Sequence, residues 1–213
     1  MRGEPWLARY SFSFIPYPGA LPNAGERAST SKITIFADPD GSLPHARREG
    51  EVIVSHFPQA TLLVHAEVTP SRFSSSLHGE GIVHFAGHIE QNEQEPWSSH
   101  LRFGREQQLS LAEVGLARSR ADLVVLSGCD SAQTVAVRPS YWFGLSEVLL
   151  AAGARRVIGS RRPLVDEAAQ HLIGQFYAEL TQQRPAEALR RAALSARQAG
   201  NRDWDNLVLF GGR

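Results

Sequence analysis

Short apolar runs and longer segments with helical spacing alternate along the chain. The run at 123–126 is unbroken, rich in valine and too short for a helix, which predicts a strand buried on both faces, as in a parallel sheet. Further strands are predicted at 33–37, 61–66, 81–86, 157–159 and 204–210. Helices are predicted at 45–56, 109–118, 141–152, 165–181 and 185–199, and a short helix at 70 and beyond. This alternation predicts right-handed crossovers and a mostly parallel sheet with helices on both faces, the α/β class.

The first residues depart from that rhythm. Residues 7–15 place Tyr10, Phe12 and Phe14 between small polar residues, and this period of two predicts a strand with one buried face. Residues 1–9 are interpreted as a peripheral extension. Because no internal repeat and no linker divides the rest, a single domain over 1–213 is predicted.

Two local signals refine the middle of the chain. Residues 101–103 are predicted to form a small edge strand. Ser110 precedes Glu113 by three residues, the spacing of a capping box, so the helix at 109–118 has a predicted amino-terminal cap.

Composition narrows the class of protein. The 22 basic and 22 acidic side chains balance, which gives no support for nucleic acid or an anionic membrane surface as a partner. No apolar run approaches the roughly 18 residues of a membrane span, and no charged-then-apolar leader opens the chain. A soluble, cytoplasmic protein is therefore expected. Its one cysteine excludes an internal disulfide framework and a cysteine zinc cage.

Two side chains that can take part in catalysis, those of Cys129 and His88, follow the ends of two predicted strands. Cys129 follows the strand at 123–126 after Ser127 and Gly128. The run at 81–86 repeats this design and leads, after a small-residue turn, to His88. Because open α/β sheets bind ligands at the carboxyl ends of their strands, we expect the thiol and the imidazole to share one crevice.

Other kinds of site find no support in the sequence. There is neither a G-x-G-x-x-G loop after a strand, nor a Walker lysine, nor a G-x-S-x-G elbow, so no cofactor is predicted. His84 and His88 are four residues apart, but a strand does not place such a pair on one face as a helix does. We therefore predict no metal site and interpret His84 as a core histidine.

A cysteine nucleophile with a histidine base remains as the candidate chemistry. The thiolate attacks, and the histidine first takes the thiol proton and later gives a proton to the leaving amine. From the residues alone, the alternative is that Cys129 is a small buried hydrophobe at a strand end.

Both runs resemble the CHAT domains, caspase-like peptidase domains often joined to tetratricopeptide repeats. The family's histidine motif resembles H-F-A-G-H-G, which here reads H-F-A-G-H-I at 84–89. Its cysteine motif resembles V-V-L-S-A-C-[DE]-[ST], which here reads V-V-L-S-G-C-D-S at 124–131. Flanking stretches at 37–53, 149–160 and 204–211 agree, and the likeness covers about residues 10–212.

The resemblance implies a caspase-like three-layer sandwich and a cysteine endopeptidase with a Cys–His dyad. His88 would be the general base and acid, and Cys129 the nucleophile. The backbone N–H groups of Cys129 and Ile89 would hold the oxyanion. The resemblance also implies a specific protein substrate and a regulatory protein or sensor domain, such as a repeat domain, fused or separate.

The sequence departs from the family pattern in two places, and the first is the residue after His88. Ile89 stands where the family usually has glycine, which favours a second hypothesis, a non-catalytic CHAT-like interaction module. A third hypothesis is a different α/β cysteine enzyme, such as an amidase, although no motif places the orienting acid that it would usually use.

Substrate preference at the cleavage position is left open by the sequence. Arg161 and Arg162, after Ser160, replace the family's Leu-Trp at a strand end that helps to form the cleft, and they would suit an acidic substrate side chain or form an exposed basic pair. Asp130 would suit a basic side chain or cap a helix.

Overall fold

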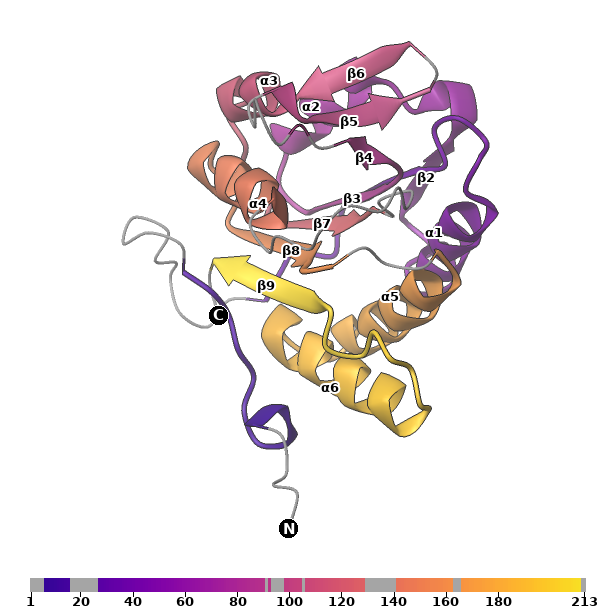
Figure 1. Ribbon diagram of the computed structural model, residues 1–213, viewed down its shortest axis with the longest axis vertical. Coiled ribbons are helices and arrows are strands. Elements are labelled where there is room, and N and C mark those ends of the chain that lie inside the picture. Colours follow the sequence, from indigo (N-terminus) through magenta and orange to yellow (C-terminus); the bar gives the residue numbers. More distant parts are fainter. Residues whose placement is uncertain are drawn as a thin grey trace.

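A computed structural model describes residues 6–15, 27–90, 92, 98–104, 106–128, 141–162 and 166–211 (Figure 1). Cys129 and Asp130 lie outside the described residues. The centre is a six-stranded sheet with the strand order β2-β1-β3-β7-β8-β9. Its strands are β1 (Ile33–Ala37), β2 (Thr61–Val64), β3 (Ile82–Ala86), β7 (Leu123–Ser127), β8 (Arg156–Ser160) and β9 (Leu207–Gly211). All neighbours are parallel except β8 and β9, so the predicted mostly parallel α/β sheet is confirmed.

Helices cover both faces of this sheet (Figure 1). One core lies under α1 (Pro44–His56), α5 (Asp166–Leu180) and α6 (Pro185–Gln198). The second lies under α2 (Pro70–Leu77), α3 (Leu111–Leu116) and α4 (Tyr141–Ala151). The capping box of Ser110 and Glu113 is present at the start of α3.

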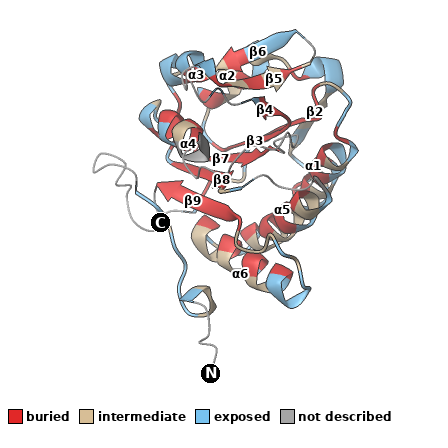
Figure 2. Ribbon diagram, viewed as in Figure 1, coloured by how far each residue is buried: buried red, intermediate tan, exposed pale blue. Residues whose placement is uncertain are grey.

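Alternating side chains of the central strands enter the two cores. In β3, Ile82 and Ala86 belong to the first core, whereas Val83 and Phe85 belong to the second. Every residue of β1, β3, β7, β8 and β9 is buried, and Figure 2 shows buried ribbon through the middle of the sheet. Burial on both faces explains why these strands are continuous apolar runs rather than alternating patterns.

A small antiparallel sheet packs on the second face. It has the order β4-β5-β6, with β4 (Ile89–Glu90), β5 (His100–Phe103) and β6 (Gln107–Ser110). The prediction of a small strand at 101–103 is confirmed, but its predicted edge position is wrong, because β5 is the middle strand. The two residues directly after His88 form β4, and no periodicity could reveal a strand of two residues.

The prediction of a half-buried strand at 7–15 is also wrong. The segment begins with a 3-10 helix, η1 (Trp6–Ala8), and only Phe14 pairs with the sheet, in an isolated bridge to Phe210 of β9. Tyr10 is 55% exposed and Phe12 is 44% exposed. The Arg190 side chain of α6 donates to the backbone oxygens of Leu7 and Ala8, so η1 lies against α6 and is not part of the sheet.

Phe73 of α2 is the centre of the second core, and its replacement tests that core. Its ring lies 5.4 Å from that of Phe36, 5.7 Å from that of Phe85 and 5.7 Å from that of Phe103. Phe73→Ala is expected to lower the free energy of unfolding by about 3–5 kcal/mol, because a fully buried ring leaves a cavity. Denaturant unfolding measures this. Leu116→Ala, at a residue 84% exposed, is the control and should stay within about 0.5 kcal/mol of wild type; equal losses would contradict this core.

Candidate active site

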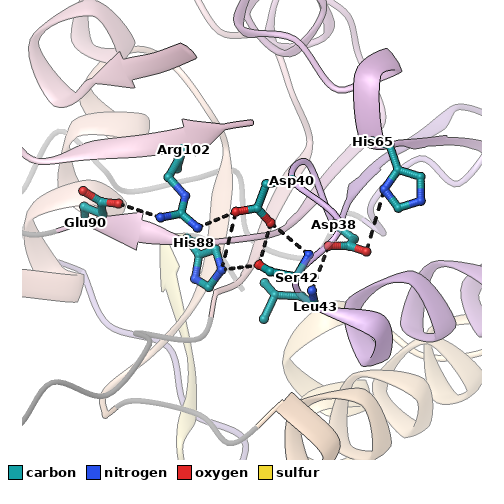
Figure 3. Close-up of polar contacts among 8 residues, drawn as sticks. All are labelled: Asp38, Asp40, Ser42, Leu43, His65, His88, Glu90 and Arg102. Carbon is teal, nitrogen blue, oxygen red and sulfur yellow. Dashed lines mark hydrogen bonds and ion pairs between the residues drawn. The ribbon is translucent and has the colours of Figure 1, made fainter. Parts of the chain in front are cut away.

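The carboxyl ends of β1 and β3 bring a braced loop beside His88 (Figure 3). This loop, residues 38–43, connects β1 to α1, and Asp38 holds it at several points. The Asp38 N–H donates to Ala86 O at 2.9 Å, and its Oδ1 accepts from the Leu43 N–H at 2.8 Å. Asp38 has a φ of 49°, and aspartate is among the residues that most readily adopt this conformation. The loop therefore presents its remaining side chains from a defined backbone.

His88 lies against two side chains of this loop. It is only 7% exposed, and its Nε2 lies 2.8 Å from Ser42 Oγ. The Ser42 hydroxyl donates to Asp40 Oδ1 at 2.6 Å, and Asp40 Oδ2 lies 4.0 Å from His88 Nε2. A hydroxyl can donate only one hydrogen bond, and Ser42 already donates its own to the Asp40 carboxylate. His88 Nε2 must therefore donate to Ser42, which assigns the ring the Nε2–H tautomer.

The other ring nitrogen of His88 follows from this assignment. In the neutral Nε2–H tautomer, Nδ1 carries the lone pair. Nδ1 is buried and has no hydrogen-bond partner among the described residues. The site thus holds a buried imidazole with its basic nitrogen unengaged by the described part of the chain, which is the state that a general base requires.

Arg102 of β5 supports the carboxylate behind His88. It forms ion pairs with Asp40 Oδ2 and, at 3.1 Å, with Glu90 Oε1 (Figure 3). Burial acts to raise the pKa of Asp40, but the hydrogen bonds from Ser42, followed by Arg102, outweigh it and hold this pKa below its ordinary value of 3.8. Asp40 is therefore a carboxylate at neutral pH.

The ends of β3 and β7 meet closely beyond their last paired residues. Ala86 of β3 pairs with Ser127 of β7, so His88 and Cys129 each follow a matched pair by two residues. A Cβ placed on Gly128 would lie 2.9 Å from Ile89 Cδ1 and 3.0 Å from Gly87 O. The residue before Cys129 thus touches the residues on either side of His88.

Ile89 fits its position although the family pattern favours glycine there. It belongs to β4 and faces Leu101, while Arg102 N donates to His88 O at 3.0 Å. This bond defines Ile89 and Leu101 as a non-hydrogen-bonded antiparallel pair, so the Ile89 N–H points away from β5. Its φ is not positive, and a β-branched residue suits such extended backbone.

The sequence-predicted cleft residues Arg161 and Arg162, which follow β8, both pair with Asp205. Arg161 Nη2 lies 3.1 Å from Asp205 Oδ2, and Arg162 Nη2 lies 2.8 Å from Asp205 Oδ1. The Asn206 side chain binds the N–H and the carbonyl of Arg162. Two arginines share one carboxylate. They are therefore not an unpaired basic pair, but together with Asp205 they keep a net charge of one positive unit. Ser160 is buried, and its hydroxyl has no partner among the described residues.

Sequence reasoning missed three residues of the site, which are Asp40, Ser42 and Arg102. The turn motif D-P-D-G at 38–41 predicted only a turn, and neither Asp40 within it nor Ser42 directly after it carried a sign of His88, which lies 46 residues beyond Ser42. Arg102 lay in a predicted strand with no neighbour assigned. His84 is buried in the core, as its place in a strand predicted.

The described residues provide neither a metal-binding cluster nor a membrane-spanning helix. No described group of three or more histidine, cysteine or acidic side chains is arranged to hold a metal ion. Within the same part of the chain, no helix is both long and apolar enough to cross a membrane.

Comparison with known families identifies the family of this chain. The family model described as the CHAT domain matches residues 2–210, and the chain therefore belongs to the CHAT family. The comparison with curated proteins returned no significant match.

Several solved structures share the architecture. Gingipain R (RgpB), described as an Arg-specific cysteine proteinase, matches with a TM-score of 0.58 and 12% identity, over 87% of this chain and 48% of that one. The complex of Porphyromonas gingivalis RgpB pro- and mature domains matches with a TM-score of 0.52 and 12% identity, over 87% and 49%. Separase in the Saccharomyces cerevisiae separase–securin complex matches with a TM-score of 0.58 and 14% identity, over 89% and 12%.

These likenesses confirm the predicted caspase-like α/β fold. The chain spans about half the length of the gingipain chains and about an eighth of the separase chain. At such low identities the activities of those proteins are not carried over to this chain with the fold.

The contact of Gly128 with Ile89 generates a test of the site's packing. Gly128→Ala is expected to cost about 1–3 kcal/mol of unfolding free energy, because the added methyl group meets Ile89 and Gly87 O. In an Ile89→Ala background the same change should cost less, by about 0.5 kcal/mol or more, in a double-mutant cycle of denaturant unfolding. Strictly additive losses would show that the two residues do not touch.

Proposed function

We propose that this CHAT domain is a cysteine endopeptidase in which Cys129 is the nucleophile and His88 is the general base and acid. The observation that carries the proposal is the state of His88: a buried ring whose Nε2 is held by Ser42 and whose Nδ1 has no described partner. The packing of Gly128 against Gly87 and Ile89 supports the approach of Cys129 to that nitrogen.

In the proposed reaction, His88 Nδ1 accepts the Cys129 thiol proton, and the thiolate sulfur bonds to the carbonyl carbon of the scissile peptide. The carbonyl electron pair moves to oxygen and forms an oxyanion. When that pair returns, the C–N bond breaks, and the imidazolium gives its proton to the leaving amine. Water, deprotonated by His88, then attacks the thioester, and the departing sulfur recovers the proton.

Asp40 and Ser42 are positioning residues in this scheme. Ser42 Oγ accepts a hydrogen bond from His88 Nε2–H and so keeps the lone pair on Nδ1. The Asp40 charge, 4.0 Å from Nε2, stabilises the imidazolium that forms during the reaction. This pair supplies the orienting acid that no sequence motif revealed. The lack of such an acid therefore no longer argues against an amidase or another unrelated cysteine enzyme, and trials with small amide and ester substrates separate that hypothesis from the peptidase.

Backbone donors hold the oxyanion in the proposal. The Ile89 N–H points away from its neighbour strand, which supports its use as one donor. The N–H of Cys129 is the other. An isoleucine at this position therefore does not favour the non-catalytic module, because the N–H direction is set by the strand pairing and not by the side chain.

Two sets of residues are proposed to meet the substrate at the cleavage position. Arg161 and Arg162, beside Ser160, retain a net positive charge after Asp205 is counted and would attract an acidic side chain. Asp130 would instead attract a basic one. A protein substrate and a regulatory protein or sensor domain follow from the resemblance to CHAT domains and remain proposals.

Labelling with irreversible cysteine-peptidase probes tests the dyad. Probes with acidic or basic side chains at the cleavage position are incubated with wild type, Cys129→Ala and His88→Ala, with and without cell extract as a source of activator, and intact mass is recorded. Wild type should be labelled, Cys129→Ala should not, and His88→Ala should react about 10²–10⁴-fold more slowly.

The identity of the reactive probe assigns the pocket. Labelling by acidic probes, lost in Arg161→Gln, would assign recognition to the arginines, and labelling by basic probes would assign it to Asp130. The absence of labelling under every condition would contradict the peptidase proposal and favour the non-catalytic interaction module.

Removal of the group behind His88 tests its orientation. Ser42→Ala and Asp40→Asn are each expected to lower kcat about tenfold to a hundredfold with little change in KM, because neither residue is placed against the substrate. The pH midpoint for alkylation of Cys129 should rise in Asp40→Asn, since the lost carboxylate no longer favours the imidazolium that stabilises the thiolate.

A matched control accompanies these variants. Glu80→Gln removes an exposed carboxylate that is paired with Arg120, and it should leave kcat and the pH midpoint unchanged. An unchanged midpoint in Asp40→Asn as well would exclude the proposed support of His88.

A further inference from the structure

A second polar network lies within the sheet's first core. Glu49 of α1 places its Oε1 2.7 Å from His84 Nε2, an ion-pair distance without the alignment of a hydrogen bond. Its Oε2 accepts from the Ser127 hydroxyl at 2.9 Å. The Tyr177 hydroxyl lies 3.2 Å from His84 Nδ1. All four residues are buried: Glu49 is 1% exposed and His84 is completely covered.

The protons of this network follow from its neighbours. Burial, and then the charge of Glu49, raise the pKa of Tyr177 well above its ordinary value, so its hydroxyl keeps its proton. Tyr177 can therefore donate to His84 Nδ1, which leaves a proton on Nε2 toward Glu49. If Nε2 carried no proton, its lone pair would face a lone pair of the Glu49 carboxylate at 2.7 Å, and the two would repel each other.

This network is not part of a reaction centre itself. Its four side chains are enclosed between α1, α5 and the sheet, so none of them can touch a bound peptide. A buried carboxylate is costly unless each oxygen is partnered, and well-packed apolar residues are often equally stabilising. Stability alone is therefore a weak explanation for a glutamate at this position.

The placement of Glu49 offers a more specific explanation. One oxygen holds Ser127, the last residue of β7 and the second before Cys129. The other lies on His84, in the strand that leads to His88. Glu49 itself belongs to α1, which begins two residues after Ser42. The Glu49 carboxylate therefore contacts both β3 and β7, the two strands that lead to the proposed dyad. It does so from α1, the helix that follows the loop at 38–43.

We propose that Glu49 and Ser127 are positioning residues that fix the carboxyl end of β7, and hence Cys129, relative to His88. The inference rests on the proposed peptidase function. The ladder between β3 and β7 is registered as far as Ala86 and Ser127, and the Ser127 side chain adds a tether at the point where the ladder ends. His84 completes the tether by holding the second carboxylate oxygen.

Alkylation of the protein's one thiol tests the proposal directly. Because the chain has a single cysteine, iodoacetamide uptake by intact mass reports Cys129 alone. The rate is measured against pH for Ser127→Ala, Ser127→Thr, Glu49→Gln, His88→Ala and wild type, with circular dichroism and thermal unfolding of each. Cleavage of whichever probe-derived peptide wild type accepts supplies kcat and KM.

Ser127→Ala and Glu49→Gln are expected to fold and to lower kcat about tenfold to a hundredfold at nearly constant KM, with slower alkylation near neutral pH. Ser127→Thr keeps the hydroxyl and should recover most of the loss. Two matched controls should behave as wild type in these assays: Ser146→Ala, at an equally buried serine outside the network, and Glu51→Gln, at an exposed residue of the same helix.

Other outcomes overturn the inference. If Ser127→Ala unfolds at a lower temperature but alkylates and cleaves as wild type, the network only stabilises the fold. If threonine fails to recover what alanine loses, the hydroxyl is not the cause. The proposed function fails separately: in that case His88→Ala would alkylate like wild type, whatever the network variants do. Should Glu49→Gln not fold, the two Ser127 variants still decide.

Discussion

The parallel pairing of β3 with β7 is the constraint on which the rest of this domain depends. Both strands are buried on both faces, so a shift of one residue along either strand would exchange the side chains of the two cores. Only the register that pairs Ala86 with Ser127 is therefore compatible with both cores. His88 lies two residues beyond that pair, so the core packing that fixes the register also fixes where β3 delivers the imidazole.

Much of this arrangement could be predicted from sequence because the core is built from local patterns. The strand at 33–37 and the ends of most helices lie within one or two residues of their predicted places, since apolar runs and capping residues act locally. The segment at 7–15 shows the limit. Its period of two indicated a buried face. Burial depends, however, on what packs against a segment, and the side chains of Tyr10 and Phe12 remain exposed.

The candidate site divides in the same way. The proposed dyad of His88 and Cys129 could be suggested from the sequence because each residue follows a predicted strand in a short motif. Asp40, Ser42 and Arg102 were not, because their meeting depends on the pairing of β1 with β3 and on a small sheet whose first strand has two residues. Polar side chains in a turn have no periodicity, so only the folded chain shows which of them face a histidine.

Asp38 has a consequence for how the domain would respond to a ligand. Its backbone and side chain join β3, the start of α1 and the segment after β2 through bonds to Ala86, Leu43 and His65. A loop held in this way has already lost its conformational entropy during folding. Ser42 then needs no rearrangement when a peptide arrives, so ordering this loop would subtract nothing from the affinity, and the reorganisation energy around His88 would be small.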